Sequence, residues 1–292
     1  MQNNTFAVIG GDKRCAYVAQ FLVGDRFEVK TVGLELSGIV DASHINTLDE
    51  ALATADFIIL PLPLVDKSGA MPSQYSNVKL DVYNIIKSAR RESVIFAGRI
   101  PGAVATFAQE CGKNMFDYYL REELQVMNAV PTAEGAIEQI MSHIPTTVFG
   151  SSIMVTGFGR TAQALCLLLK AMGADVTVYA RKSAALAHAK SVGCNVGHIN
   201  KMSFEKLNFD AIVNSVPAQI FSHDVLVNVR PDCYMLDIAS APGGIDTEYA
   251  AKTGIAVDIA PSLPGQVAPK TAGRIIKETV LNMIEERGCA VE

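Results

Sequence analysis

The residue pattern with the clearest chemical meaning is a glycine-rich turn between an expected strand and an expected helix. Residues 157–162 read Gly-Phe-Gly-Arg-Thr-Ala and follow the apolar run 152–156. In this pattern the first glycine permits a tight turn, the second lets the backbone approach a pyrophosphate, and a small third residue lets the helix pack on the strand. The alternative is an ordinary tight turn. The residues predicted to bind a dinucleotide are Gly157, Phe158, Gly159, Arg160 and Thr161.

The end of the next expected strand bears on the choice of cofactor. NAD-binding folds carry Asp or Glu there for the ribose 2′-hydroxyl, and residues 180–183 include neither. An arginine can stack on and pair with a 2′-phosphate, which a carboxylate would repel. The pattern favours NADP, unless these basic side chains are only solvated charges at a helix start. The predicted contacts are Ala180, Arg181, Lys182 and Ser183.

Two further segments, 214–217 and 237–240, directly follow expected strands of the same unit. A doubly wound sheet binds its ligand at the carboxyl ends of its strands, so these loops are predicted to contact the nicotinamide half. Any single side chain in them is as readily an ordinary loop residue. The predicted contacts are Ser215, Val216, Pro217, Asp237 and Ala239.

The segment 261–273 is the strongest candidate for binding an anionic substrate group. It contains three prolines and two glycines, which predict a rigid loop leading into the last helix. Lys270 and Thr271 would precede free N–H groups at that helix start, where backbone donors favour an anion. The alternative is a plain capping turn.

Two arginines after other expected strands are weaker candidates for substrate binding. Arg99 could reach a carboxylate or be a surface side chain. The turn before Arg14 contains Gly10 and Gly11 without the full glycine pattern, so we do not predict a second nucleotide site. Asp12 is well placed to cap the following helix. The alternative is that Asp12 or Arg14 faces the substrate.

Composition excludes several classes of protein. The chain has 292 residues, of which 49% are hydrophobic and 19% charged, which excludes a disordered chain. Its 25 basic and 30 acidic residues give a net charge of −5, so it has no basic field for nucleic acid or an anionic membrane. The N-terminus lacks a signal-peptide pattern, and no apolar run could span a bilayer. We therefore expect a cytoplasmic protein.

The six cysteines and five histidines show no metal-ligand spacing. We predict no metal site and expect most of the cysteines to be buried free thiols.

Short apolar runs alternate along the chain with longer amphipathic segments, which predicts two α/β units with parallel sheets. The boundaries are expected at residues 1–130 with the final helix 275–292 for one domain, and 131–274 for the other. A linking helix is predicted to start at Pro131, and the last helix is predicted over 272–287.

The layout resembles that of the D-2-hydroxyacid dehydrogenases, in which a nicotinamide domain interrupts a substrate domain. This resemblance implies two doubly wound parallel-sheet domains, a flavodoxin-like N-terminal domain and a Rossmann dinucleotide-binding domain, joined by linking helices. The catalytic arginine and histidine of that family align with Ala241 and Lys270 here. The two differences disfavour a D-2-hydroxyacid dehydrogenase proper.

The chain is more similar to the family of dipicolinate synthase A subunits. The most specific part of this similarity is Leu-Pro-Gly-Gln-Val-Ala-Pro-Lys-Thr-Ala-Gly at 263–273. Ala241 departs from the arginine expected in the family, which argues against a carboxylate-binding role for its loop. The other similar segments are 9–12, 128–135, 157–161 and 236–244.

The resemblance implies an NAD(P)-dependent oxidoreductase that acts on a CH–CH bond of a ring. It would oxidise dihydrodipicolinate, or its hydroxylated tetrahydro precursor, to pyridine-2,6-dicarboxylate in the mother-cell cytoplasm during sporulation. The implied partners are the small dicarboxylate and the flavoprotein-like B subunit of dipicolinate synthase, and we also expect a homo-oligomer. The ring loses a hydride and a proton, so a base is needed, for which Lys270 and Glu134 are the candidates. A cofactor-binding subunit without catalytic activity is the remaining alternative.

Overall fold

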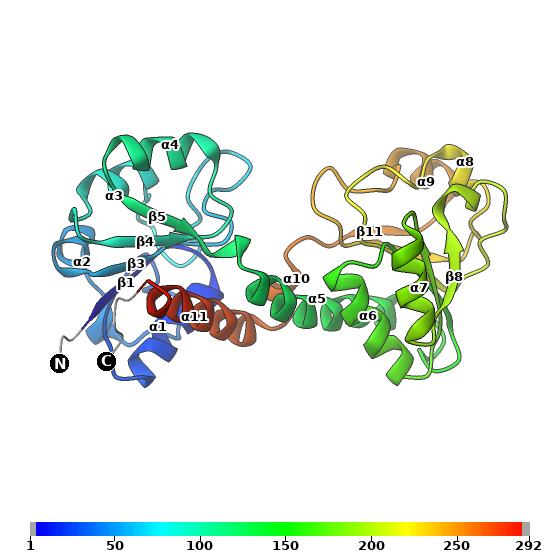
Figure 1. Cartoon of the computed structure of the whole chain (residues 1–292), viewed down its shortest axis with the longest axis horizontal. Helices are drawn as coiled ribbons and strands as arrows, with labels where there is room; N and C mark the ends of the chain where they lie inside the picture. The colour runs from blue at the N-terminus through cyan, green and yellow to red at the C-terminus, as the bar shows by residue number, and fades with distance from the viewer. Residues whose placement is uncertain (1–3, 288–292) are drawn as a thin grey trace. The chain divides into compact units, whose positions relative to one another are not determined.

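The computed structural model describes residues 4–287 and contains two compact units. Of the described residues, 4–127 and 268–287 form the first unit and 128–267 form the second. Each is built on one parallel sheet flanked by helices (Figure 1), which confirms the predicted fold class. None of the helices within residues 4–287 is both long enough and apolar enough to cross a membrane.

The first unit has a five-stranded sheet in the order β2-β1-β3-β4-β5, which is the flavodoxin-like order. All residues of β1 and β3 are buried, as expected for parallel strands covered on both faces. Its strands are β1 (Thr5–Ile9), β2 (Glu28–Val32), β3 (Phe57–Ile59), β4 (Val94–Ala97) and β5 (Asn114–Asp117). Its helices are α1 (Lys13–Gly24), α2 (Leu48–Thr54), α3 (Val82–Ser88), α4 (Gly102–Glu110) and α11 (Pro269–Glu285), with short 3₁₀ turns η1 (Ala42–His44) and η2 (Tyr118–Leu120).

The last helix of the chain, α11, returns to the first unit and packs against α1 (Figure 1). The two helices approach closely at Gly273, where a Cβ atom would be 2.7 Å from the backbone oxygen of Arg14 and 2.8 Å from the Cβ of Tyr17. The apolar side chains of α11 share one core with α1 and the sheet. They are Ile275, Ile276, Val280, Met283 and Ile284.

The second unit has a six-stranded sheet in the order β11-β10-β9-β6-β7-β8. This is the doubly wound Rossmann order, and the winding reverses between β6 and β9, where such sheets bind their ligand. Its strands are β6 (Ser152–Thr156), β7 (Asp175–Ala180), β8 (Asn195–His198), β9 (Ala211–Asn214), β10 (Tyr234–Asp237) and β11 (Val257–Ile259). Its helices are α6 (Arg160–Ala171), α7 (Ser183–Ser191), α8 (His223–Leu226), α9 (Thr247–Thr253) and α10 (Leu263–Val267), with a 3₁₀ turn η3 (Ile199–Lys201).

The linking helix starts earlier than predicted. It is α5 (Glu122–His143), and Pro131 lies inside it. Glu122 and Glu123 occupy the first turn, where negative charge is favoured by the helix dipole. The prediction from Pro131 was wrong because a proline inside a helix removes one backbone hydrogen bond without always ending the helix.

The last helix also starts earlier than predicted, at Pro269 rather than at residue 272. Proline is well suited to a first helical turn because its φ is already helical and its missing N–H is not needed there. Much of the predicted rigid loop 261–273 is therefore helical, in α10 and in the first turn of α11. Lys270 and Thr271 lie within that turn rather than before it.

The contact at Gly273 makes a testable prediction about stability. Gly273→Ala should lower the free energy of unfolding of the first unit by about 1–3 kcal/mol, because its Cβ would overlap backbone atoms of α1. Gly102→Ala is the matched control, since a Cβ at that helix start would have no atom of another described segment within 4 Å. Urea unfolding followed by circular dichroism measures both, and equal midpoints would contradict the packing described.

Candidate functional site

The predicted glycine turn joins β6 to α6, and its two glycines have different surroundings. Gly157 has a φ of +79°, and a Cβ there would lie 2.9 Å from Ser215 Oγ and 3.1 Å from a methyl group of Val216. Gly159 caps α6 with a φ of −81° and no side-chain hydrogen bond. No described atom lies within 4 Å of a Cβ at Gly159. This open cradle over a helix N-terminus fits a pyrophosphate.

The other residues predicted in this turn are placed by the start of α6. Ala162 is fully buried, so its small side chain allows the helix to pack closely on the sheet. The ring of Phe158 lies edge-on to that of His188, with their centroids 5.2 Å apart. Arg160 is exposed and Thr161 is half-buried, both in the first turn of α6.

The basic residues predicted to select NADP follow β7. Ala180 is the buried last residue of that strand, and Lys182 caps α7 without a side-chain hydrogen bond. Arg181, Lys182 and Ser183 are all exposed. Within residues 4–287, the side chains of Arg181 and Lys182 form no hydrogen bond or ion pair, so both charges are available to a ligand. Basic side chains that are merely solvated at a helix start would also be exposed and without partners, so the cofactor preference stays a prediction.

A buried hydrogen-bond network joins the carboxyl ends of β6, β9 and β10. Thr156 Oγ1 donates to Asn214 Oδ1 at 2.6 Å, and Asn214 Nδ2 donates to Asp237 Oδ1 at 2.9 Å. The same carboxylate accepts from the backbone N–H of Ala239 at 3.0 Å and of Gly244 at 2.7 Å. None of the three side chains is more than 2% exposed. The network thereby fixes the loop that follows β10.

The loop after β9 is held by the same residues. The backbone N–H of Val216 donates to Asn214 Oδ1 at 3.1 Å, and Ser215 Oγ donates to the backbone oxygen of Thr156 at 2.6 Å. Pro217 is exposed beyond them. Sequence reasoning missed Thr156 and named Asn214 only as part of the loop 214–217, although an asparagine ending an apolar strand was a signal for a buried amide.

The Gly10-Gly11 turn of the first unit is filled by the chain itself. A Cβ at Gly10 would lie 2.7 Å from the terminal methyl of Met71 and 2.9 Å from a methyl of Leu80. The N–H of Gly11 donates to the backbone oxygen of Pro72 at 2.6 Å. This turn has no open cradle of the kind found at Gly159.

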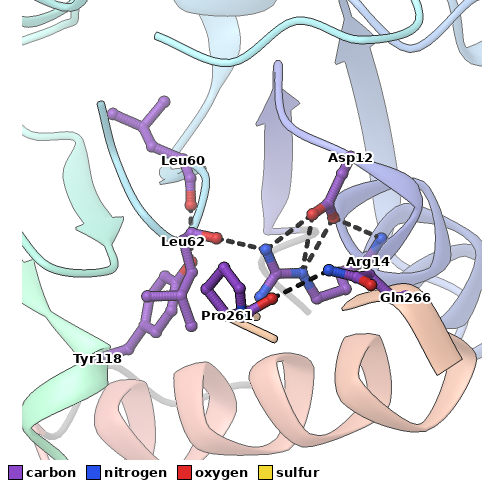
Figure 2. A network of polar contacts seen from close by, with 7 residues as sticks. All are labelled: Asp12, Arg14, Leu60, Leu62, Tyr118, Pro261 and Gln266. Carbon is purple, nitrogen blue, oxygen red and sulfur yellow. Dashed lines mark hydrogen bonds and ion pairs between the residues drawn. The ribbon is translucent and has the colours of Figure 1, made fainter. Parts of the chain in front are cut away.

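Asp12 caps α1 as predicted, since its carboxylate accepts from the backbone N–H of Arg14 at 2.9 Å. The Arg14 guanidinium lies against the same carboxylate, with Nη2 at 2.7 Å, and Nη2 also donates to the backbone oxygen of Leu62 (Figure 2). Tyr118 fixes the neighbouring segment by donating from its hydroxyl to the backbone oxygen of Leu60 at 2.9 Å (Figure 2). Burial acts to lower the pKa of Arg14, but Asp12 outweighs it and the pKa lies above its ordinary value. A substrate contact by Arg14 stays a prediction.

Arg99 has a strained backbone, with a φ of +55° that non-glycine residues rarely adopt. Asp117 holds this conformation by accepting from the backbone N–H groups of Arg99 at 3.1 Å and Ile100 at 2.9 Å. The exposed guanidinium lies 4.4 Å from the ring centroid of Tyr119 and donates to its hydroxyl at 2.7 Å. One edge of the guanidinium therefore binds Tyr119, and a substrate role for Arg99 also stays a prediction.

Lys270 and Thr271 are exposed in the first turn of α11, whose cap residue Ala268 makes no side-chain hydrogen bond. The close approach of Gly273 to the backbone of Arg14 brings the starts of α11 and α1 together. Glu134 is exposed on the part of α5 that belongs to the second unit.

Comparison with solved structures defines the class of fold. A transhydrogenase from Sinorhizobium meliloti superposes with a TM-score of 0.73 at 14% identity, covering 97% of this chain and 94% of that one. Other structures of this shape are named as lactate and alanine dehydrogenases. This chain therefore shares its two-domain fold with these proteins.

Sequence comparison is more specific. Residues 5–119 match the family described as the N-terminal domain of the dipicolinate synthase A subunit. The A subunit of dipicolinate synthase from Bacillus subtilis (strain 168) is 31% identical over 283 residues, which are 96% of this chain and 95% of that protein. The crystal structure of the B. subtilis protein superposes with a TM-score of 0.87 at 30% identity, covering 99% and 98% of the two chains. The chain belongs to the family of dipicolinate synthase A subunits.

The cradle at Gly159 yields a prediction that separates folding from binding. Gly159→Val should change the free energy of unfolding by less than about 0.5 kcal/mol, because its φ is ordinary and its surroundings are open. It should weaken cofactor binding at least about tenfold by filling the phosphate cradle. Gly157→Ala should instead lose stability as well, because of its positive φ. Thermal unfolding and cofactor fluorescence titration distinguish the two, and normal binding by Gly159→Val would rule out the cradle.

Proposed function

We propose that this chain is a dipicolinate synthase component that oxidises dihydrodipicolinate, or the hydroxylated tetrahydro precursor that dehydrates to it, to pyridine-2,6-dicarboxylate. The observation that carries this proposal is the open glycine cradle at Gly159 in a chain that matches a dipicolinate synthase A subunit over 96% of its length. NADP, with NAD as the alternative, supplies the hydride acceptor when bound. The ring loses one hydride and one proton and becomes aromatic, so the protein must orient the ring and accept the proton.

We propose the second unit as the cofactor domain. The N–H groups at the start of α6 hold the pyrophosphate, and Gly159 lets it approach the backbone. Arg181, with Lys182 and Ser183, holds the 2′-phosphate at the end of β7. The loops after β9 and β10, fixed by their buried network, receive the nicotinamide half.

We propose the first unit as the substrate domain, because it contains the candidate cationic side chains and the start of α11. Two substrate carboxylates need two anchors. Lys270 and Thr271 with the N–H groups of α11 provide one. Arg14 or Arg99 provides the other. Lys270 is the first candidate for the proton acceptor, and Glu134 the second.

Membership of the family supports a proposal for the cellular setting. The B. subtilis relative is named as one lettered subunit of its synthase, which supports a second, different subunit in the complex. We propose the flavoprotein-like B subunit of dipicolinate synthase for that role, homo-oligomeric assembly, and the mother-cell cytoplasm during sporulation as the location. Assays of the chain alone and with the B subunit test the activity, and no turnover of dihydrodipicolinate in either case would overturn the proposal.

The exposed arginine after β7 predicts a preference for NADP. Arg181→Ala should raise the Kd for NADP by roughly ten- to a hundredfold, the effect of losing a charge-assisted pair, and leave the Kd for NAD nearly unchanged. Lys190→Ala, which removes an exposed charge farther along α7, is the matched control. Titration with both oxidised cofactors measures this, and equal or tighter binding of NAD by the parent protein would contradict it.

The exposed lysine in the first turn of α11 predicts a loss of catalytic efficiency. Lys270→Met should lower kcat/KM about a hundredfold or more, with cofactor affinity unchanged. Lys270→Arg keeps the charge and should retain partial activity if Lys270 anchors a carboxylate, whereas loss of nearly all turnover indicates a base. Lys67→Met, in an exposed loop of the same unit, is the control. Parental efficiency in Lys270→Met would mean that this turn only begins a helix.

A further inference from the structure

Asp237 is a buried carboxylate that no cation neutralises. It is 2% exposed and accepts three hydrogen bonds, from the amide of Asn214 and the backbone N–H groups of Ala239 and Gly244. All three donors are neutral groups. Across residues 4–287, no lysine, arginine or histidine forms an ion pair with it.

The loop after β10 is wrapped closely around this carboxylate. Gly243 has a φ of +85°, and a Cβ there would lie 3.0 Å from Asp237 Oδ2. A Cβ at Gly244 would lie 2.3 Å from Asn214 Nδ2. Two consecutive glycines therefore allow the backbone to enclose the charge without any side chain between them.

The hydrogen bonds hold the charge without cancelling it. The three hydrogen bonds to the Asp237 carboxylate all come from neutral donors, so none of them brings a positive charge to it. A charge in the protein interior acts over longer distances than one in water because the surroundings screen it less. Asp237 is thus a fixed negative charge at the carboxyl edge of the second sheet.

This charge lies in the half of the unit expected to hold nicotinamide. The sheet reverses its winding between β6 and β9, with Arg181 on the β7 side and Asp237 at the end of β10 on the other side. A dinucleotide extends across such a switch point with one mononucleotide on each half. If the β7 side takes the 2′-phosphate, the β10 side takes the nicotinamide.

We propose that Asp237 makes the second unit bind the oxidised nicotinamide cofactor more tightly than the reduced one, through its field and without touching the ring. The oxidised nicotinamide ring carries a positive charge and the reduced ring is neutral, so a nearby fixed negative charge stabilises only the former. Tighter binding of the oxidised cofactor by itself opposes hydride transfer to that cofactor. In the proposed reaction the substrate ring becomes aromatic, and this favours hydride transfer and offsets the opposition. The inference rests on the proposed function only in requiring a nicotinamide cofactor.

The test compares equilibrium affinities for NADP⁺ and NADPH in the full chain, with no substrate present. Titration followed by NADPH fluorescence gives the Kd for NADPH, and displacement of bound NADPH by NADP⁺ gives the Kd for NADP⁺. Asp237→Asn should lower the preference for NADP⁺ over NADPH by about fivefold or more. Thr156→Val is the matched control, because it breaks the network at Asn214 and leaves the charge. Thr156→Val should raise the Kd for NADP⁺ and the Kd for NADPH by the same factor.

A second variant covers the case in which Asp237→Asn fails to fold. Ala241 is exposed in the same loop, so Ala241→Lys adds a positive charge without disturbing the core and should also lower the preference for NADP⁺. Ala241→Met is its neutral control and should leave the preference unchanged.

The outcomes separate this inference from the proposed function. An unchanged preference in folded Asp237→Asn, or in Ala241→Lys if the first variant does not fold, overturns the role of the charge. If Thr156→Val lowers the preference for NADP⁺ as much as Asp237→Asn does, the role of the charge is also overturned, because the hydrogen-bond network would then be responsible for the preference. A parent that binds neither cofactor overturns both proposals. A parent with the expected shifts but no turnover of dihydrodipicolinate overturns only the proposed function.

Discussion

Every strand pairing in both sheets is parallel, and this constraint decides where the chain can bind a ligand. Parallel strands need crossover helices, so both faces of each sheet are covered and only the ends remain accessible. All carboxyl ends of one sheet then lie along one edge. For this reason the glycine cradle and the Asp12 cap lie directly after strands, and the buried network lies where three strands end.

The two parallel-sheet units could be predicted because their strands and helices carry local signals. Apolar runs gave the strands, and the glycine turn with its flanking strands gave the Rossmann unit. The flavodoxin-like order of the first unit came from resemblance instead. The starts of α5 and α11 were predicted wrongly, because Pro131 and Pro269 are compatible with two positions in or near a helix. Only the packing around each proline selects between them.

The candidate site was predictable where it depends on backbone conformation and was not where it depends on partners distant in sequence. Gly157 and Gly159 are recognisable from neighbouring residues alone. The bond from Thr156 to Asn214 spans 58 positions, and that from Asn214 to Asp237 spans 23. Nothing local to Asp237 shows that its carboxylate is enclosed by its own loop. Similarly, the sequence around Arg14 does not reveal the backbone oxygen of Leu62 as its acceptor.

The return of α11 to the first unit has a consequence for the order in which the chain is made. The first unit needs residues from both sides of the second, so a ribosome releases the whole of the second unit before the first is complete. Until α11 emerges, the face of α1 that carries Val18 and Leu22 lacks the apolar side chains that share its core. At this stage the nascent chain contains every residue of the second unit and lacks the α11 segment of the first. During this interval the chain exposes the apolar side chains of α1 that α11 later covers.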